Sequence, residues 1–145
     1  LLQSGANVAL GTDSVASNNS LDFMEEMKVM AIGCKISAGD PAAGRPEDIL
    51  RAATAGGAKA QGRMDCGILR EGNKADLIVL DISQANMHPV HSIVNNLVYS
   101  CSGKDVVLTM VDGKVLYDDG EYTTIDVEKT IYQAELSTKK ILERL

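Results

Sequence analysis

The sequence predicts an α/β chain up to about residue 62, followed by a small β-rich part with a closing helix. Two observations carry this prediction. Apolar residues recur at helical spacing over residues 20–36, which is typical of an amphipathic helix. Further along, two apolar runs flank Asp112-Gly113, which is a strong signal for a two-residue β-hairpin turn. The chain is therefore expected to change from helical to strand-rich structure along its length.

The first predicted element is a short strand at Val8-Ala9-Leu10, which leads into a polar run from Gly11 to Asp22. This strand places the carboxylate of Asp13 at its end. In barrel enzymes the ends of strands carry the loops that hold the chemistry. Asp13 is therefore the first candidate for a functional residue, although a loop carboxylate that caps local backbone amides is an alternative role. For the polar stretch 17–20 we favour turn and cap roles.

The opening Leu1-Leu2-Gln3-Ser4-Gly5 has neither an initiator Met nor a signal-like pattern, and it resembles the end of a helix that runs into a strand. A chain of 145 residues can form one domain with a sizeable core. A complete eight-stranded α/β barrel, however, takes roughly 200 residues or more. We therefore expect the polypeptide to be the C-terminal piece of a larger enzyme.

The predicted helix at 20–36 has Asn19 or Ser20 as its cap, and acidic residues in its first turns suit the helix dipole. Its apolar stripe is rich in methionine, and at helical spacing such a stripe is assigned to the core. The members of the stripe are Phe23, Met27, Met30 and Cys34.

A second helix is predicted to begin at Arg45-Pro46 and to run through Ala60, with Gly62 as its stop. Gly56-Gly57 should weaken it by about 1 kcal/mol per glycine relative to alanine. We therefore expect either a break into two short helices or a close contact with neighbouring backbone at this point.

The second half changes period and has shorter apolar runs bounded by polar residues. A further turn is expected at Asp118-Asp119-Gly120. The other elements expected after residue 67 are a buried strand at 75–81, a short helix at 91–98, hairpin strands at 106–111 and 114–117, and a helix at 126–145.

Composition argues against two classes of partner. The net charge of −6 repels a phosphate backbone, and an aromatic content of 3% leaves few rings on which bases can stack, so no nucleic-acid partner is expected. No apolar run approaches the roughly 20 residues that cross a bilayer, so no membrane insertion is expected.

The cysteines and histidines suggest no site of their own. Cys34, Cys66 and Cys101 are widely spaced and form no Cys-x-x-Cys pair, so we expect reduced, mostly buried thiols in a cytoplasmic protein. His88 and His91 are read as part of a polar turn that enters a short helix, in preference to a pair of metal ligands.

Three stretches in one order and spacing point to a known family. They are Leu10-Gly11-Thr12-Asp13 with Ser17-Asn18-Asn19-Ser20-Leu21-Asp22, then residues 52–62 with 67–81, and residues 96–106 running into 111–116. Together they resemble the metal-dependent amidohydrolases, in the branch of nucleoside and triazine deaminases and chlorohydrolases. The Asp13 loop is most similar to the group of 5-methylthioadenosine/S-adenosylhomocysteine deaminases.

The resemblance implies a fold and a site. Residues 1–66 would be the end of a (β/α)8 barrel, with its last strand and helices, and residues 67–145 would be part of a small β-sandwich with the closing helix. Asp13 would be both catalytic and a ligand of a divalent metal, with zinc as the expected ion. The whole protein would then be a cytoplasmic homo-oligomer that deaminates a small nucleoside-type substrate by means of metal-activated water.

This chain departs from the family pattern in lacking the His-x-His pair, the further histidines and the glutamate that protonates the ring. A catalytic zinc usually has about three protein ligands. We therefore expect that the 145-residue chain alone neither holds the metal firmly nor deaminates a substrate. Two alternatives stay open, a related chlorohydrolase or aminohydrolase of another heterocycle and a non-catalytic interaction module.

Overall fold

The computed structural model describes residues 4–144 and begins with a long segment, 4–22, that contains no helix or strand. The predicted strand at 8–10 is therefore wrong. A strand forms by hydrogen bonding to a neighbouring strand, and the backbone here bonds to a helix instead, since Leu10 N donates to Ala52 O over 3.2 Å. The helix end expected at residues 1–5 lies largely outside the described residues, and residues 4 and 5 form a turn.

Helix α1 (Phe23–Ala38) confirms the first predicted helix, shifted toward the C-terminus by two to three residues. Its cap is Asp22 rather than Asn19 or Ser20. The Asp22 carboxylate accepts hydrogen bonds from Met24 N at 2.9 Å and Glu25 N at 3.3 Å, which satisfies two of the free donors at the helix start. Gly39 ends the helix in the left-handed conformation.

The second predicted helix is continuous in the chain but not uniform. It consists of α2 (Pro46–Arg51), a π-helical turn η1 (Ala52–Gly56) and α3 (Gly57–Ala60). The disturbance expected at the two glycines is thus a change of helix type together with a close contact. A Cβ atom on Gly56 would lie 2.2 Å from Val8 O, so only glycine allows this approach.

Four short strands form one antiparallel sheet in the order β1-β2-β3-β4. They are β1 (Leu77–Leu80), β2 (Val106–Val111), β3 (Lys114–Asp118) and β4 (Glu121–Tyr122). The predicted hairpin is confirmed, because Asp112 and Gly113 join β2 to β3 with φ values of 51° and 77°. The second turn, at Asp119 and Gly120, also has positive φ values, of 42° and 98°, and joins β3 to β4.

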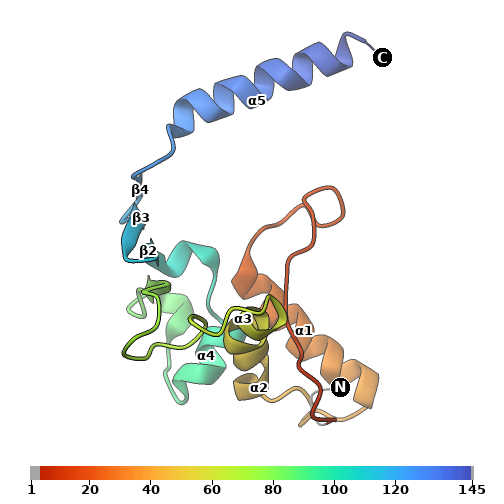
Figure 1. The fold of residues 1–145 in the computed structure, drawn as a ribbon. Coiled ribbons are helices and arrows are strands. Elements are labelled where there is room, and N and C mark those ends of the chain that lie inside the picture. Colours follow the sequence, from red (N-terminus) through yellow and green to blue (C-terminus); the bar gives the residue numbers. More distant parts are fainter. Residues whose placement is uncertain (1–3, 145) are drawn as a thin grey trace.

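Three short helices lie between β1 and β2, and a long helix follows the sheet. The short ones are η2 (Ala85–Met87), α4 (Ile93–Tyr99) and η3 (Gly103–Asp105). The long one, α5 (Val127–Leu142), confirms the predicted terminal helix but projects away from the rest of the chain (Figure 1), and its described residues are all exposed. Within residues 4–144, no helix is both long and apolar enough to cross a bilayer.

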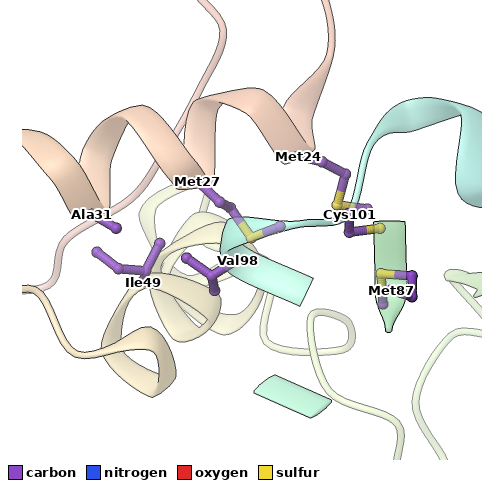
Figure 2. Close-up of a cluster of buried hydrophobic side chains, with 7 residues drawn as sticks. All are labelled: Met24, Met27, Ala31, Ile49, Met87, Val98 and Cys101. Carbon is purple, nitrogen blue, oxygen red and sulfur yellow. The ribbon is translucent and has the colours of Figure 1, made fainter. Parts of the chain in front are cut away.

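The core lies where α1, α2 and α4 meet (Figure 2), and α1 contributes Met24, Met27 and Ala31 to it. Met30 and Cys34 of the predicted stripe are partly buried and pack against this cluster. The cluster takes residues from both sides of the predicted domain boundary at 66/67. The buried members from the rest of the chain are Ile49, Met87, Val98 and Cys101.

Candidate functional site

Asp13 lies in the loop between the start of the described chain and α1 and is exposed. Its φ of 59° is in the left-handed region, which costs a non-glycine residue roughly 1–2 kcal/mol. The neighbouring Thr12 hydroxyl donates to the backbone oxygen of Asp13 over 3.2 Å. The carboxylate itself accepts no hydrogen bond from any residue between 4 and 144, so its oxygens are available to a ligand.

The left-handed conformation of Asp13 has no hairpin to explain it. Among the described residues, the other non-glycine positions with positive φ are Asp112 and Asp119, and each begins a tight turn between antiparallel strands. Such turns require positive φ, whereas the Asp13 segment joins no strands. A strained residue of this kind persists where its surroundings hold it, and such residues cluster at functional sites.

The backbone that leads to Asp13 is fixed on the π-helical turn. Leu10 N donates to Ala52 O over 3.2 Å, and Asn7 Nδ2 donates to Gly56 O over 3.0 Å. Because Gly56 has no side chain, Val8 comes close to the helix between these two bonds. π-Helical turns are rare and occur frequently at functional sites. Here η1 holds the backbone of Leu10, three residues before Asp13.

The loop that follows Asp13 is held by Asn18. Its Nδ2 atom donates to Thr12 O over 3.0 Å and also contacts Glu26 Oε1. Its Oδ1 atom accepts from Ser20 N at 3.3 Å. The turn and cap roles expected for residues 17–20 are confirmed in part, because Ser20 Oγ also accepts from Asp22 N at 3.1 Å.

The sequence interpretation missed the role of Asp22. Its Oδ1 atom caps α1, and its Oδ2 atom accepts a hydrogen bond of 2.9 Å from Gly103 N in η3. The carboxylate therefore joins the start of α1 to a segment 81 residues away. The spacing Asp22-x-x-Glu25 resembles the helix-start pattern of a cap residue followed three positions later by Glu, and this signal could have identified the cap.

Asp13 has the donor chemistry of one metal ligand. A free carboxylate oxygen is a ligand for zinc and for harder divalent cations. Within the part of the chain that the structure describes, no three His, Cys, Asp or Glu side chains lie together as a metal-binding group. Among the described residues, the Asp13 carboxylate could therefore fill no more than one position of a metal centre, and further ligands would have to come from elsewhere.

His88 and His91 lie in the irregular segment between η2 and α4, and both are exposed. His88 N donates to Ala85 O over 3.2 Å, which closes the turn after η2. This agrees with the predicted polar turn before a short helix.

The three thiols are free. Cys101 is buried, and its burial is the main reason why its pKa is raised to about 11, with the nearby Asp105 carboxylate adding to the shift. Cys34 and Cys66 are only half-buried, so the expectation of mostly buried thiols holds for Cys101 alone.

Asp76 has a structural role in the sheet. Asp112 N donates to its Oδ1 atom over 2.7 Å, and Arg63 pairs with its Oδ2 atom at 2.9 Å. The bond from Asp112 N is the main cause that lowers the pKa of Asp76, and Arg63 lowers it further. This carboxylate is occupied by protein donors, unlike that of Asp13.

Comparison with known proteins identifies relatives over nearly the whole chain. Residues 1–116 match the model of the Amidohydrolase family. The chain is 43% identical to a 5'-deoxyadenosine deaminase of Methanosarcina acetivorans over 99% of its own length, which is 33% of the relative. It is 42% identical to a 5-methylthioadenosine/S-adenosylhomocysteine deaminase of Pelotomaculum thermopropionicum with the same coverage. The chain spans about a third of the length of these curated relatives.

Solved structures give the same picture. An adenosine deaminase from Xanthomonas campestris with bound zinc matches with a TM-score of 0.92 and 34% identity, over 95% of this chain and 32% of that one. An atrazine chlorohydrolase from Arthrobacter aurescens complexed with zinc matches with a TM-score of 0.78 and 25% identity, over 93% and 30% of the two chains.

Proposed function

This chain belongs to the amidohydrolase family, and on that premise we propose that it forms part of a metal-dependent deaminase to which it contributes Asp13. In this proposal residues 1–66 belong to the catalytic barrel, and residues 67–145 belong to a small β-sandwich. The remaining metal ligands and the substrate pocket come from parts of the protein beyond this chain.

The observation that carries the proposal is the state of Asp13. Its carboxylate is exposed, accepts no hydrogen bond from the described residues and sits on left-handed backbone that no hairpin requires. A carboxylate with only a capping role would accept local amide hydrogens, as Asp22 does. The family membership and the geometry therefore favour the same residue.

The chemistry that a divalent metal supplies in such a site is a lowered pKa of water, which prepares the water to attack the ring carbon that bears the amino group. The part of this chain is to hold and move a proton. One Asp13 oxygen would hold the metal, and the carboxylate would accept the proton of the attacking water and pass it toward the departing ammonia. The rigid attachment of residues 7–10 to η1 keeps the carboxylate in place during this transfer.

The substrate we propose is a 5'-modified adenosine, such as 5-methylthioadenosine, S-adenosylhomocysteine or 5'-deoxyadenosine. The printed names of the two curated relatives, each above 40% identity, support this class. Zinc is the proposed metal, because both of the solved neighbours described above contain it. Deamination or dechlorination of a triazine is the second candidate, favoured by the chlorohydrolase neighbour at the lower identity of 25%.

We further propose that the whole protein is cytoplasmic and homo-oligomeric, with a small-molecule substrate and no nucleic-acid or membrane partner. The acidic net charge of −6 supports the exclusion of nucleic acid.

Release of ammonia from methylthioadenosine tests the function. The proteins to compare are the longest natural polypeptide that contains this segment, its Asp13→Asn variant and the 145-residue chain, each supplied with zinc. Asparagine adopts left-handed backbone readily, so Asp13→Asn should retain the fold while lowering kcat by a factor of about 10² or more, the scale of a lost acid–base group. Activity is expected in the unmutated long protein alone.

The matched control is Asp119→Asn, which makes the same change at another exposed aspartate with positive φ, in the turn between β3 and β4. It should leave kcat unchanged. Activity in the short chain, or in Asp13→Asn at the level of the parent, would contradict the proposal. Activity of the long protein on a triazine but not on an adenosine derivative would favour the second candidate.

A further inference from the structure

The side chain of Asn18 uses its donors and its acceptor within the loop that carries Asp13. Its Nδ2 group donates to Thr12 O over 3.0 Å and contacts the Glu26 carboxylate, and its Oδ1 atom accepts from Ser20 N at 3.3 Å. Its backbone N also donates to Ser14 O over 2.8 Å. The amide thus connects the residue before Asp13 to α1.

The position of this connection matters for Asp13. Leu10, three residues before Asp13, is hydrogen-bonded to η1. The next link to another element is the Asn18 side chain, which donates to Thr12 O and contacts Glu26 on α1. Asp13 directly follows Thr12 and is strained, with φ of 59°. Strained backbone persists only where the surroundings over-determine it, and Asn18 is the side chain that restrains the loop on this side.

An amide is the side chain that this position requires. Thr12 O and the Glu26 carboxylate are both acceptors, so the group between them has to donate two hydrogen bonds, while Ser20 N requires an acceptor. An aspartate of the same shape would place a negative oxygen against two acceptors, one of them charged. Neighbouring Asn19 is exposed and makes no hydrogen bond within the described part of the chain, so it offers a matched control.

We propose that Asn18, held by Glu26, is a positioning residue that orients the Asp13 carboxylate toward the metal centre. The inference rests on the proposed function, because it assumes that Asp13 binds a metal. Groups that orient metal ligands typically change metal affinity or activity by about 10- to 100-fold when they are removed. Asn18 touches neither metal nor substrate in this role and acts through the backbone of Thr12 and Asp13.

The test uses the longest natural polypeptide and measures bound zinc by elemental analysis after dialysis against graded chelator, together with kcat and KM. Asn18→Asp is expected to weaken zinc binding and to lower kcat, each by about 10- to 100-fold, with KM changed less than threefold. Asn19→Asp, which adds the same charge one residue away, is expected to match the parent.

A rescue separates positioning from a general loss of fold. In Asn18→Asp combined with Glu26→Gln, the new amide at position 26 can donate to the new carboxylate, so the contact with α1 returns. Thr12 O still lacks its donor, so the recovery is expected to be partial. Zinc affinity and kcat should recover at least threefold relative to Asn18→Asp alone. No recovery would overturn the role given to Glu26 and with it the proposal.

The outcomes distinguish the two proposals. If Asn18→Asp retains zinc and activity while Asp13→Asn loses both, the positioning role is wrong and the proposed function stands. If the parent binds zinc but deaminates no adenosine derivative, the zinc measurements alone still decide the role of Asn18. A parent that binds no divalent metal would overturn both proposals.

Discussion

Among residues 4–144, Asp105 is the one charged residue that is buried, with 4% of its surface exposed. Its Oδ2 atom accepts hydrogen bonds from Ser102 N at 2.8 Å, Asn86 Nδ2 at 2.9 Å and Ser102 Oγ at 3.2 Å. Burial raises the pKa of this carboxyl, but these hydrogen bonds together outweigh it and hold the pKa below its ordinary value. The charged form is therefore the one that the fold stabilises.

We predict that Asp105 stabilises the fold at neutral pH and that acid removes this contribution. Because the folded-state pKa is lowered, the stabilisation is complete above the unfolded-state pKa of about 3.9 and disappears as the pH falls through the lower folded-state value. Asp105→Asn should reduce the free energy of unfolding by roughly 1.5–3 kcal/mol at pH 7. Urea unfolding from pH 7 to pH 3 measures the difference between parent and variant, which should narrow below about pH 4.

Asp118→Asn is the control, since Asp118 is exposed on β3. Its effect should stay within about 0.5 kcal/mol, as for most surface substitutions. A difference between parent and Asp105→Asn that stays constant down to pH 3 would show that the buried charge is not the source of the stability.

At the scale of elements, the π-helical turn η1 connects the core to the segment that leads to Asp13. Its Ala52 and Gly56 carbonyl groups accept from Leu10 N and from the side chain of Asn7, so the turn bonds to the segment before Asp13 rather than only to itself. Ala52 is also buried. The position of the Asp13 loop therefore depends on the geometry of this one helical turn.

Replacing each of the two adjacent glycines of this helix by alanine should change the stability of the fold in opposite directions. In Gly56→Ala the new Cβ would lie 2.2 Å from Val8 O, so the segment 7–10 has to move, at a cost of about 1–3 kcal/mol. In Gly57→Ala the nearest atom is Ala52 O at 3.8 Å, which is ordinary contact, and the helical propensity of alanine should stabilise by up to about 1 kcal/mol.

Thermal unfolding of the two variants of the long protein measures this difference, and kcat measures its effect on the site. Gly56→Ala should lower both the unfolding temperature and kcat, whereas Gly57→Ala should lower neither. Equal behaviour of the two variants would show that Val8 does not rest on η1.

At the scale of the whole molecule, large apolar side chains stay exposed on two helices. On α1, Val29 is 58% and Ile36 is 76% exposed, on the side away from the core cluster. Helix α5 projects from the rest of the chain (Figure 1). Its exposed large apolar side chains are Val127, Ile131, Tyr132, Leu136, Ile141 and Leu142. Apolar surface of this extent is typical of chains that pack against further protein.

We predict that the isolated 145-residue chain self-associates, because association buries this apolar surface. Sedimentation velocity between 1 and 100 μM should show a mass that rises with concentration. Replacing Ile131 and Leu142 of α5 by glutamine should weaken the association, while Glu135→Gln on the same helix should not. A stable monomer at all these concentrations would contradict the prediction and would favour an independently folding module.

The sequence determined the helices and turns that depend only on residues close together in the chain. The spacing of apolar residues over 20–36 and over 126–145 predicts helices, because residues at this spacing lie on one face of a single helix. Asp112-Gly113 predicts its hairpin because the two residues tolerate the positive φ that the turn needs. The sequence also proposed Asp13 as a site residue, from its place after an apolar run and from the family resemblance, but the left-handed backbone of Asp13 was not predicted.

The tertiary structure decided what depends on distant partners. Residues 8–10 are apolar enough for a strand, but a strand needs neighbours, and here the backbone bonds to η1 instead. The Asp22 carboxylate accepts a hydrogen bond from Gly103 N, 81 residues away, and Asp105 accepts one from Asn86, 19 residues away, and no pattern in the neighbouring sequence predicts either contact. Local sequence specifies which conformations are favourable, and packing specifies which groups meet.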